Sequence, residues 1–353
     1  MTKKIFSFPS LLSANPYLEL FYNNLSKFDF CYLGGLKVND GWLYTNNKKI
    51  DILHFHWPED IWRIRSKNKI GRLRALIGFW RYLRLAKKLG IKIWWTLHNL
   101  EHHEGIDFVD KLGYKVLAKQ SDLIICHSKY GANILKKRDN PRGELVVMYH
   151  GLYEGIYPSP APRDEVLREI GFDSSLPTFC CLGYIRPYKG FDLAIDAINL
   201  LDRDVQLIIA GNVHKDYDIN VLQKKVSFNK KCKIIPKFLS NQKFSDIINA
   251  CDAVILPYKK ITTSGLVLAA WTFNKPVIAA DHPYFREISQ GVEAAIEFFR
   301  PGDVGDLAKA ISRFLLKAQQ SRLDALNRLA QKYRWNNCIQ SLVKVVNNKQ
   351  KDI

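Results

Sequence analysis

Long apolar runs are absent from this 353-residue sequence, and acidic residues are comparatively scarce. No uninterrupted apolar stretch reaches the roughly 18 residues that a membrane-spanning helix needs. Lys and Arg number 53 against 34 Asp and Glu, so the formal net charge is +19. A field of this sign favours anionic partners, such as a nucleotide sugar, a nucleic acid or an anionic membrane surface.

Disulfide and metal-binding patterns are also lacking. The seven cysteines are odd in number, and none has the spacing of a metal site. Several of them lie in or beside apolar runs, where cysteine behaves as a small hydrophobic residue. Reduced thiols and a cytoplasmic setting are therefore expected.

Residues 61–100 contain no Asp or Glu but eleven Lys or Arg. Within this segment, apolar residues recur near helical spacing between Ile70 and Leu85, with basic residues interleaved. This pattern predicts a basic amphipathic helix that lies on anionic lipid at the inner face of the cell membrane. The alternative is a sheet-covering helix with a solvated basic face.

Short apolar runs alternate with longer helical patterns along the whole chain, which is typical of parallel sheets covered by helices on both faces. The N-terminal run is broken by Pro9 and is interpreted as a first strand rather than a signal peptide. The expected strands are Ile5–Phe8, Ile52–Phe55, Ile91–Leu97, Leu123–Cys126, Leu145–Met148, Phe179–Leu182, Gln206–Ala210, Lys233–Ile235, Ala253–Leu256 and Pro276–Ala279. The expected helices include Arg72–Leu89, Asp110–Lys119, Lys129–Lys137, Phe191–Leu201, Asn241–Ala250 and Gly305–Lys317.

A proline-rich stretch from Tyr153 to Arg163 predicts a stiff linker between two domains. The expected fold is α/β, with two doubly wound Rossmann-like domains facing a central cleft that binds a nucleotide. The predicted boundaries are 1–158 for the first domain, 164–325 for the second and 326–353 for a C-terminal helix; the resemblance to a known family described below implies that this helix packs back on the first domain.

Residues 183–190 read Gly-Tyr-Ile-Arg-Pro-Tyr-Lys-Gly, between an apolar run and a helical pattern. A glycine turn between a strand and a helix presents free amides and the positive end of the helix dipole. Arg186 and Lys189 add two cations that suit a phosphate group. The alternative is an ordinary strand-to-helix connection.

Taken together, the motifs of residues 178–300 resemble those of GT-B glycosyltransferases, in particular family 4 and its bacterial exopolysaccharide-type relatives. The matching segments are Gly183–Gly190, Leu207–Asn212, Lys237–Ser240, Ile247–Pro257, Thr262–Ala270 and Lys275–Ala279. The resemblance implies a hexosyltransferase that uses a nucleotide sugar, with a UDP-sugar such as UDP-glucose favoured by family frequency. It also implies a growing polysaccharide or lipid-linked saccharide as the acceptor.

The resemblance and the charge pattern together imply the donor-binding residues. They are Gly183, Arg186, Lys189, Lys237, Phe238, Thr263, Ser264, Gly265 and Leu266. Cations and helix-end amides are expected to stabilise the leaving diphosphate, so no metal or other cofactor is expected, and no Asp-x-Asp pair is expected to hold a metal ion there. Lys189 as a solvated surface lysine, and Phe238 as a core side chain, are the plainer alternatives.

The sequence departs from the family pattern in two ways. Tyr184 follows the first glycine, where relatives carry arginine, and Arg186 comes two residues later. The family's paired glutamates are missing, because no Asp or Glu occurs between Asp252 and Asp281. Ala269 or Ala270 occupies the position of the second glutamate. Donor identity and anomeric outcome are therefore left open.

The segment Thr96–Glu104 follows a predicted strand and is rich in histidine and glutamate. If the reaction inverts configuration, a general base must activate the acceptor hydroxyl. The candidates, in order of preference, are Glu104, His98 and His103. If it retains configuration, a histidine positions the donor sugar instead.

Asn15, His56, Trp57 and Glu59 are assigned to the acceptor side, because they follow the first predicted strand and a second one. The flat face of Trp57 is expected to stack on a sugar ring.

Three alternatives to this interpretation were considered. One is a GDP-mannose donor with an inverting outcome on the same fold. Another is a basic nucleic-acid-binding protein, although no known binding module is present. The third is a nucleotide-sugar epimerase, which the acid-free stretch argues against. We expect a monomer or weak dimer that does not bind nucleic acid.

Overall fold

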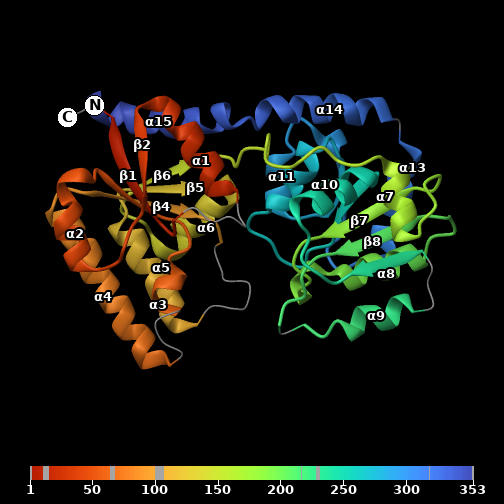
Figure 1. The fold of residues 1–353 in the computed structure, drawn as a ribbon, viewed down its shortest axis with the longest axis horizontal. Coiled ribbons are helices and arrows are strands. Elements are labelled where there is room, and N and C mark those ends of the chain that lie inside the picture. Colours follow the sequence, from red (N-terminus) through yellow and green to blue (C-terminus); the bar gives the residue numbers. More distant parts are fainter. Residues whose placement is uncertain are drawn as a thin grey trace. The chain divides into compact units, whose positions relative to one another are not determined.

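The computed structural model describes residues 2–10, 16–63, 68–99, 107–215, 217–227, 231–317 and 319–351. It divides into two compact units (Figure 1). Unit 1 consists of residues 1–151 and 334–353, and unit 2 consists of residues 152–333. The divisions thus fall a few residues from the boundaries expected at 158 and 326.

Unit 1 contains a parallel sheet of six strands in the order β2-β1-β3-β4-β5-β6. The strands are β1 (Lys3–Phe8), β2 (Phe30–Gly35), β3 (Ile52–Phe55), β4 (Lys92–Leu97), β5 (Leu123–Cys126) and β6 (Glu144–Val147). Its helices are α1 (Tyr17–Leu25), α2 (Asp40–Asn46), α3 (Glu59–Arg63), α4 (Lys69–Lys88), α5 (Phe108–Gln120), α6 (Lys129–Asp139) and α15 (Trp335–Lys351).

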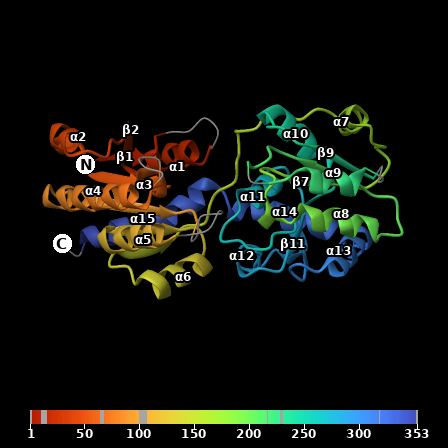
Figure 2. The same cartoon turned by 90° about the horizontal axis from the view of Figure 1, so that it is seen from below.

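Two helical layers cover the sheet of unit 1. Helices α2 to α6 bury one continuous apolar core, which includes Trp62, Phe79 and Tyr114 (Figure 2). On the other face α15 packs along α1 and against β6 (Figure 1). The C-terminal helix therefore completes the first unit rather than the second.

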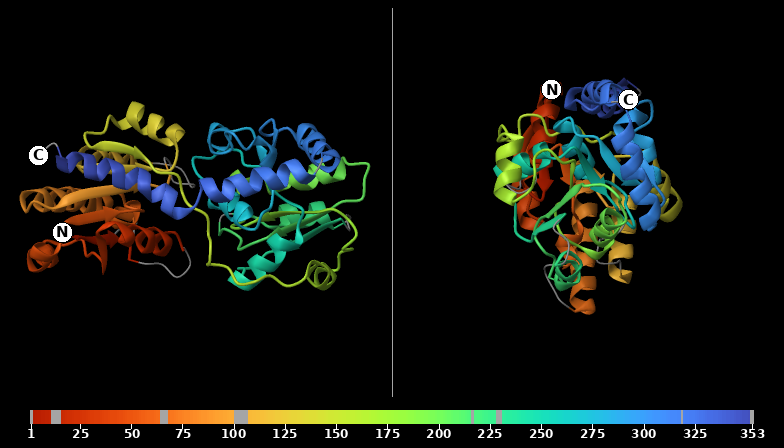
Figure 3. Two further views of the ribbon diagram at one scale, coloured as in Figure 1. Left: turned by 90° about the horizontal axis from the view of Figure 1, so that it is seen from above. Right: turned by 90° about the vertical axis from the view of Figure 1, so that its right-hand side faces the viewer.

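Unit 2 contains a second parallel sheet of six strands, in the order β12-β11-β10-β7-β8-β9. The strands are β7 (Thr178–Leu182), β8 (Gln206–Ala210), β9 (Cys232–Ile235), β10 (Ala253–Leu256), β11 (Val277–Ala280) and β12 (Ile296–Phe299). The helices are α7 (Arg163–Ile170), α8 (Phe191–Asn199), α9 (Asn220–Val226), α10 (Asn241–Ala250), α11 (Gly265–Thr272), α12 (Pro283–Ile288), α13 (Val304–Leu316) and α14 (Gln319–Lys332). Helix α8 contacts α9 and α13, and α14 runs beside α11 (Figure 3).

The α/β fold with two parallel sheets is thus confirmed, and the N-terminal segment is a strand as predicted. The central strands β7, β8 and β10 are fully buried, which explains their near-continuous apolar sequences. Strands β2 and β12 were not predicted from the sequence. Among the described residues, no helix combines the length and the apolar composition that crossing a bilayer requires.

Candidate active site

The turn after β7 in unit 2 requires glycine at both ends. Gly183 has φ +91° and Gly190 has φ +63°, a region that other residues rarely adopt. A Cβ at Gly183 would lie 2.9 Å from Nζ of Lys189, and one at Gly190 would overlap the carbonyl oxygen of Pro257. The turn therefore closes tightly over the side chain of Lys189.

Lys189 is buried, so it is not a solvated surface lysine. Its Nζ lies 3.4 Å from the carbonyl oxygen of Leu182 and 5.7 Å from the ring centres of Phe191 and Tyr258. Among the described residues no carboxylate forms an ion pair with it. Burial, together with the nearby Arg186, lowers the pKa of Lys189 to about 8. A buried ammonium group without a carboxylate partner is suited to binding an anion.

Arg186 is half-buried in the same turn, and its guanidinium lies over the ring of Tyr184 at 5.2 Å. Tyr184 occupies the position where relatives were expected to carry arginine. The tyrosine ring therefore supports the guanidinium by a cation–π contact, which holds the charge beside the turn.

A second helix start lies at the same edge of the sheet, after β10. Ser264 is buried at the N-cap of α11, where Tyr258 and Tyr284 both bond to it. The first-turn amides of α11, beginning at Gly265 and Leu266, have no acceptor inside the helix. Thr263 precedes them and is half-buried. These groups lie at the same edge of the sheet as the Gly183–Gly190 turn, and free amides of this kind are suited to an anionic ligand.

Lys237 and Phe238 follow β9, again at the carboxyl edge of the sheet. Phe238 is 70% exposed, so it is not a core side chain, and it remains available to a planar ligand. Both Ala269 and Ala270 are buried within α11, where they supply no carboxylate. The structure thus brings the predicted donor-side residues to one edge of the unit 2 sheet.

Two Asp-x-Asp sequences occur in the chain, and the expectation that neither holds a metal ion at this site stays a prediction. Asp202 and Asp204 precede β8 and therefore lie at the opposite edge of the sheet. Of the other pair, Asp218 is described but Asp216 lies outside the described residues. Among the described residues no group of three His, Cys, Asp or Glu side chains forms a metal site.

Five histidines gather at the carboxyl edge of the unit 1 sheet. His54 lies in β3 and His56 comes directly after it. His98, His127 and His150 come after β4, β5 and β6, respectively. The ring of Tyr17 lies at their centre, with ring centres 4.7 to 5.8 Å from four of them. The site predicted from the sequence included His56 and His98 but not Tyr22. The detectable signal was a histidine after each of four successive strands.

The five rings are held neutral. Burial lowers the pKa of His54 to about 3, of His127 to about 4 and of His150 to about 3. The pKa values of His56 and His98 are also well below the ordinary value, for the same reason. At neutral pH the cluster therefore offers hydrogen bonds rather than positive charge.

Trp57 is half-buried, and its ring stacks on His98 with centres 4.3 Å apart and planes 16° from parallel. One face of the indole is therefore occupied by the histidine. Asn15, His103 and Glu104 lie outside the described residues.

Glu59 begins helix α3, beyond the end of strand β3. Its carboxyl group is buried, and its neighbours are Tyr114 and Arg63. Burial raises the pKa of Glu59 to about 7. This places the residue between α3 and α5, where it acts on stability.

We expect Glu59→Gln to stabilise the protein at pH 8. The folded pKa is higher than that of an unfolded glutamate, so the wild-type residue favours folding below about pH 4.5 and loses this contribution as the pH rises through about 7. The gain in unfolding free energy should be on the order of 2 kcal/mol at pH 8 and near zero at pH 4.5. Urea unfolding at both pH values measures it, and an equal change at both would contradict the titration.

The comparisons with known proteins agree with this arrangement. Residues 162–333 match the family model of glycosyl transferases group 1. The chain is 24% identical over 269 residues to a GDP-mannose:glycolipid 4-beta-D-mannosyltransferase of Xanthomonas campestris pv. campestris, covering 76% of this chain and 70% of the relative.

Two solved structures resemble the whole chain in fold. Sucrose-phosphate synthase from Thermosynechococcus elongatus superposes with a TM-score of 0.74 at 12% identity, covering 99% of this chain and 100% of that one. Anabaena HepE in complex with UDP-glucose superposes with a TM-score of 0.73 at 14% identity, with the same coverage.

The two parallel α/β units, the anion-binding turn and these matches define a glycosyltransferase of the GT-B fold. Residues 162–333, which carry the match to the glycosyl transferases group 1 model, make up just under half of the chain. The chain is thus an enzyme that transfers a glycosyl group.

Proposed function

We propose that this enzyme transfers a hexosyl group from a nucleoside diphosphate sugar to a saccharide or lipid-linked saccharide, without a metal ion. The observation that carries the proposal is the buried ammonium of Lys189 beneath the Gly183 turn, with no carboxylate paired to it among the described residues. Negative charge develops on the diphosphate as the glycosidic bond breaks. Lys189, Arg186 and the amides at the start of α11 supply positive charge for it.

GDP-mannose is the donor that the sequence relative supports, since that mannosyltransferase aligns with residues of both units over 76% of the chain. UDP-glucose, which family frequency favours, is bound by a structure that resembles the chain in fold. We propose GDP-mannose transfer with inversion, in line with the beta-mannosyl product in that relative's name. In this scheme a base in unit 1 removes the acceptor proton, and Glu104 is the preferred residue.

Calorimetry with GDP, UDP, GDP-mannose and UDP-glucose in the presence of EDTA tests the proposal. We expect GDP-mannose to bind and the transferred sugar to be β-linked in the product, as read by NMR. Absence of binding by every nucleotide and nucleotide sugar would refute the proposed function. Binding of UDP-glucose alone would overturn the choice of donor.

Nucleotide binding should weaken at alkaline pH. The diphosphate needs a protonated Lys189, whose pKa in the free enzyme is about 8. Affinity for the nucleotide should therefore be highest below pH 8. It should fall as the pH rises through this value, by up to about tenfold per pH unit for a single proton. Titration of GDP between pH 7 and 9.5 measures the slope. Lys189→Met should bind weakly at every pH, and a pH-independent wild-type affinity would contradict this assignment.

Helix α4 carries the proposed contact with an anionic membrane. Its inner side buries Leu76, Phe79 and Leu83, so it does cover the sheet. Its outer side nevertheless exposes Ile70, Leu73, Ile77 and Trp80, which are spaced three or four residues apart. An apolar stripe on a helix without acidic residues fits the interface of an anionic bilayer.

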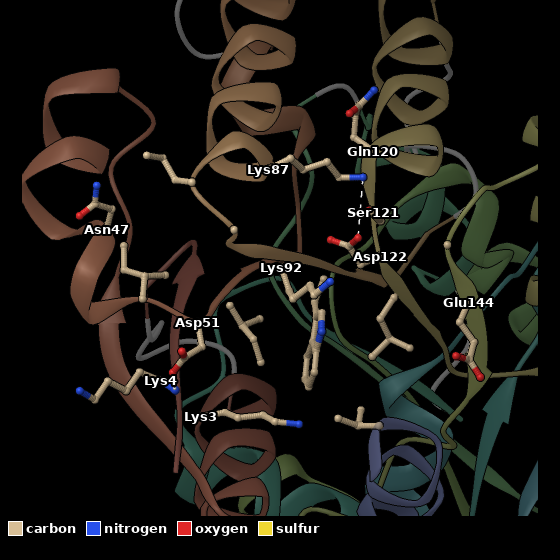
Figure 4. A pocket seen from close by; sticks show the side chains of 18 of the residues that line it. Lys3, Lys4, Asn47, Asp51, Lys87, Lys92, Gln120, Ser121, Asp122 and Glu144 are labelled. Carbon is tan, nitrogen blue, oxygen red and sulfur yellow. Dashed lines mark hydrogen bonds and ion pairs between the residues drawn. The ribbon is translucent and has the colours of Figure 1, made fainter. Parts of the chain in front are cut away.

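The basic charge continues beyond this stripe into a cavity of about 1520 Å³ at the amino ends of the unit 1 strands. Lys3, Lys4, Lys87 and Lys92 line this cavity (Figure 4). Arg84 lies over Trp80 at 5.0 Å and joins the stripe to the cavity. Lipid phosphates are the ligands that this charge favours, which supports a location at the inner face of the cell membrane.

Replacing Ile77 and Trp80 together by serine should weaken binding to phosphatidylglycerol vesicles about tenfold, since two apolar side chains no longer enter the interface. Vesicle flotation measures this, and phosphatidylcholine vesicles should bind weakly in all cases. The matched control is Leu200→Ser, an exposed leucine of unit 2. Equal vesicle binding by wild type and the double variant would argue against the contact.

A further inference from the structure

Two lysines project from one face of the unit 1 sheet at the amino ends of its strands. Ile5 of β1 pairs with Ile52 of β3, and Ile52 pairs with Lys92 of β4. Side chains alternate between the two faces of a strand, so Lys3, two residues before Ile5, lies on the same face as Lys92. Trp94 follows Lys92 on that face and is buried. The face therefore begins with two cations and continues with buried apolar residues.

Helices α1 and α15 cover this face of the sheet. His54 projects from it and meets the Tyr22 hydroxyl of α1 at 2.9 Å, and α15 contributes Val345 to the wall of the cavity at the amino ends of the strands. Figure 4 shows the side chain of Lys3 directed into this cavity and that of Lys4 directed the opposite way. The cavity thus opens at the amino end of a face that is covered by helices further along.

The charge of the cavity is positive. Eight Lys or Arg residues line it against three Asp or Glu, which favours an anionic ligand. Among the described residues, an ion pair within the cavity joins Lys87 to Asp122 at 3.8 Å, but neither Lys3 nor Lys92 takes part in one. Burial lowers the pKa of Lys3, although the nearby Asp51 raises it in part. A cation that loses hydration without gaining a carboxylate partner is suited to binding an anion.

The three carboxylates of the cavity leave these two cations available. Asp51 accepts a hydrogen bond at 2.6 Å from a backbone N–H of β1, and Asp122 accepts one at 2.8 Å from a backbone N–H of β4. Glu144 belongs to β6, which β5 separates from the strand of Lys92. An incoming anion therefore meets Lys3 and Lys92 without first displacing an ion pair of either one.

We propose that Lys3 and Lys92 bind the phosphate group of one anionic lipid at the amino edge of unit 1. A phosphate diester carries one negative charge and accepts hydrogen bonds, which the two ammonium groups donate. The histidine cluster and the ends of the strands that lead to it lie at the opposite edge of the same sheet. The lipid is therefore an anchor for the enzyme and takes no part in the reaction.

The choice of a lipid follows from the continuity of the cavity with helix α4. Trp80 of the exposed apolar stripe also lines the cavity, and Arg84 lies over its ring at 5.0 Å. A headgroup held in the cavity thus lets the acyl chains lie along the stripe, beside Ile77. This inference rests on the proposed contact of α4 with an anionic membrane, and adds to it a defined site for a single headgroup.

Calorimetry of the full chain with dihexanoylphosphatidylglycerol, a soluble short-chain lipid, tests the site. The wild type should bind one molecule per chain. Lys3→Gln combined with Lys92→Gln should weaken binding about tenfold or more, since two charge-assisted hydrogen bonds are lost. The matched control is Lys4→Gln combined with Lys48→Gln, which removes the same charge from the lining of the same cavity. It should change the affinity less than about threefold, because these charges act only through a screened field.

Two outcomes of this titration would overturn the inference. An equal loss of affinity in the two double variants would show that the cavity attracts anions by its general charge, without a site at Lys3 and Lys92. Absence of saturable binding of the short-chain lipid to the wild type would also overturn it. Inorganic phosphate is the second probe and should bind more weakly, since it lacks the apolar chains. Binding of inorganic phosphate as tight as that of the lipid would refute the lipid as the source of the phosphate.

Vesicle flotation separates this inference from the proposed membrane contact. The Lys3 and Lys92 double variant should bind phosphatidylglycerol vesicles more weakly than the Lys4 and Lys48 double variant. A wild type that does not bind these vesicles would refute the membrane contact itself. Vesicle binding by the wild type that the Lys3 and Lys92 changes leave unaltered would overturn the phosphate site alone. Unchanged GDP affinity and circular dichroism in both double variants verify that they are folded.

Discussion

Replacing Lys189 with alanine is expected to lower transfer activity at least tenfold while the fold stays intact. Lys189 is the buried cation of the Gly183–Gly190 turn, and its charge is not paired with a carboxylate among the described residues. The diphosphate is more negative in the transition state than in the donor, so loss of this charge lowers kcat as well as affinity. The free energy of unfolding should not decrease, since removing an unpaired buried charge relieves a desolvation cost.

Arg186→Ala should show a loss of the same order, because the guanidinium supports the same charge from the rim of the turn. Initial rates with saturating acceptor and circular dichroism of each variant provide the measurement. Lys233→Ala, which removes an exposed lysine from β9 of the same sheet, is the matched control. Turnover close to that of the wild type in both turn variants would refute the diphosphate-binding role.

Gly190→Ala should disrupt the turn itself and destabilise unit 2 by about 3 kcal/mol, the sum of a left-handed backbone and an overlap with the Pro257 carbonyl. The neighbouring strand cannot move away easily, because Pro257 directly follows the buried strand β10. Affinity for GDP should therefore fall at least tenfold along with stability.

Urea unfolding and calorimetry test this expectation together. The matched control is Gly291→Ala, where φ is +82° but nothing lies within 4 Å of the added Cβ. The control should show the backbone cost alone, about 1 kcal/mol. Equal destabilisation by the two substitutions would mean that the contact with Pro257 contributes nothing.

The fold could be predicted from the sequence wherever a strand is buried on both faces. Strands β3, β5, β8 and β10 have the bounds that their apolar runs predict. Strand β2 was missed because it is an edge strand that ends in two glycines and alternates in burial. Strand β12 was missed because it is short and lies at the opposite edge of its sheet.

The two parts of the candidate site also differ in how well the sequence predicts them. The Gly183–Gly190 turn was predictable because all of its groups are consecutive in sequence. The histidine cluster was not, because Tyr22 of α1 meets His54 and His56 only through the order of the strands β1, β3 and β4. The burial of Glu59 and its contact with Tyr114 could not be predicted either, because Tyr114 lies 55 residues away in the sequence.

The position of helix α15 in the sequence affects the order in which the two units fold during translation. The indole of Trp335 lies against Gly151, leaving no room for a Cβ there, and its ring is near Tyr17 and His150. Residues 1–151 emerge from the ribosome long before residue 335 is synthesised. All of unit 2 is synthesised in between. Unit 2 is then able to fold on the ribosome. In the nascent unit 1, α1 and β6 stay uncovered until α15 is synthesised. The histidine cluster reaches its final packing only after α15 has been synthesised.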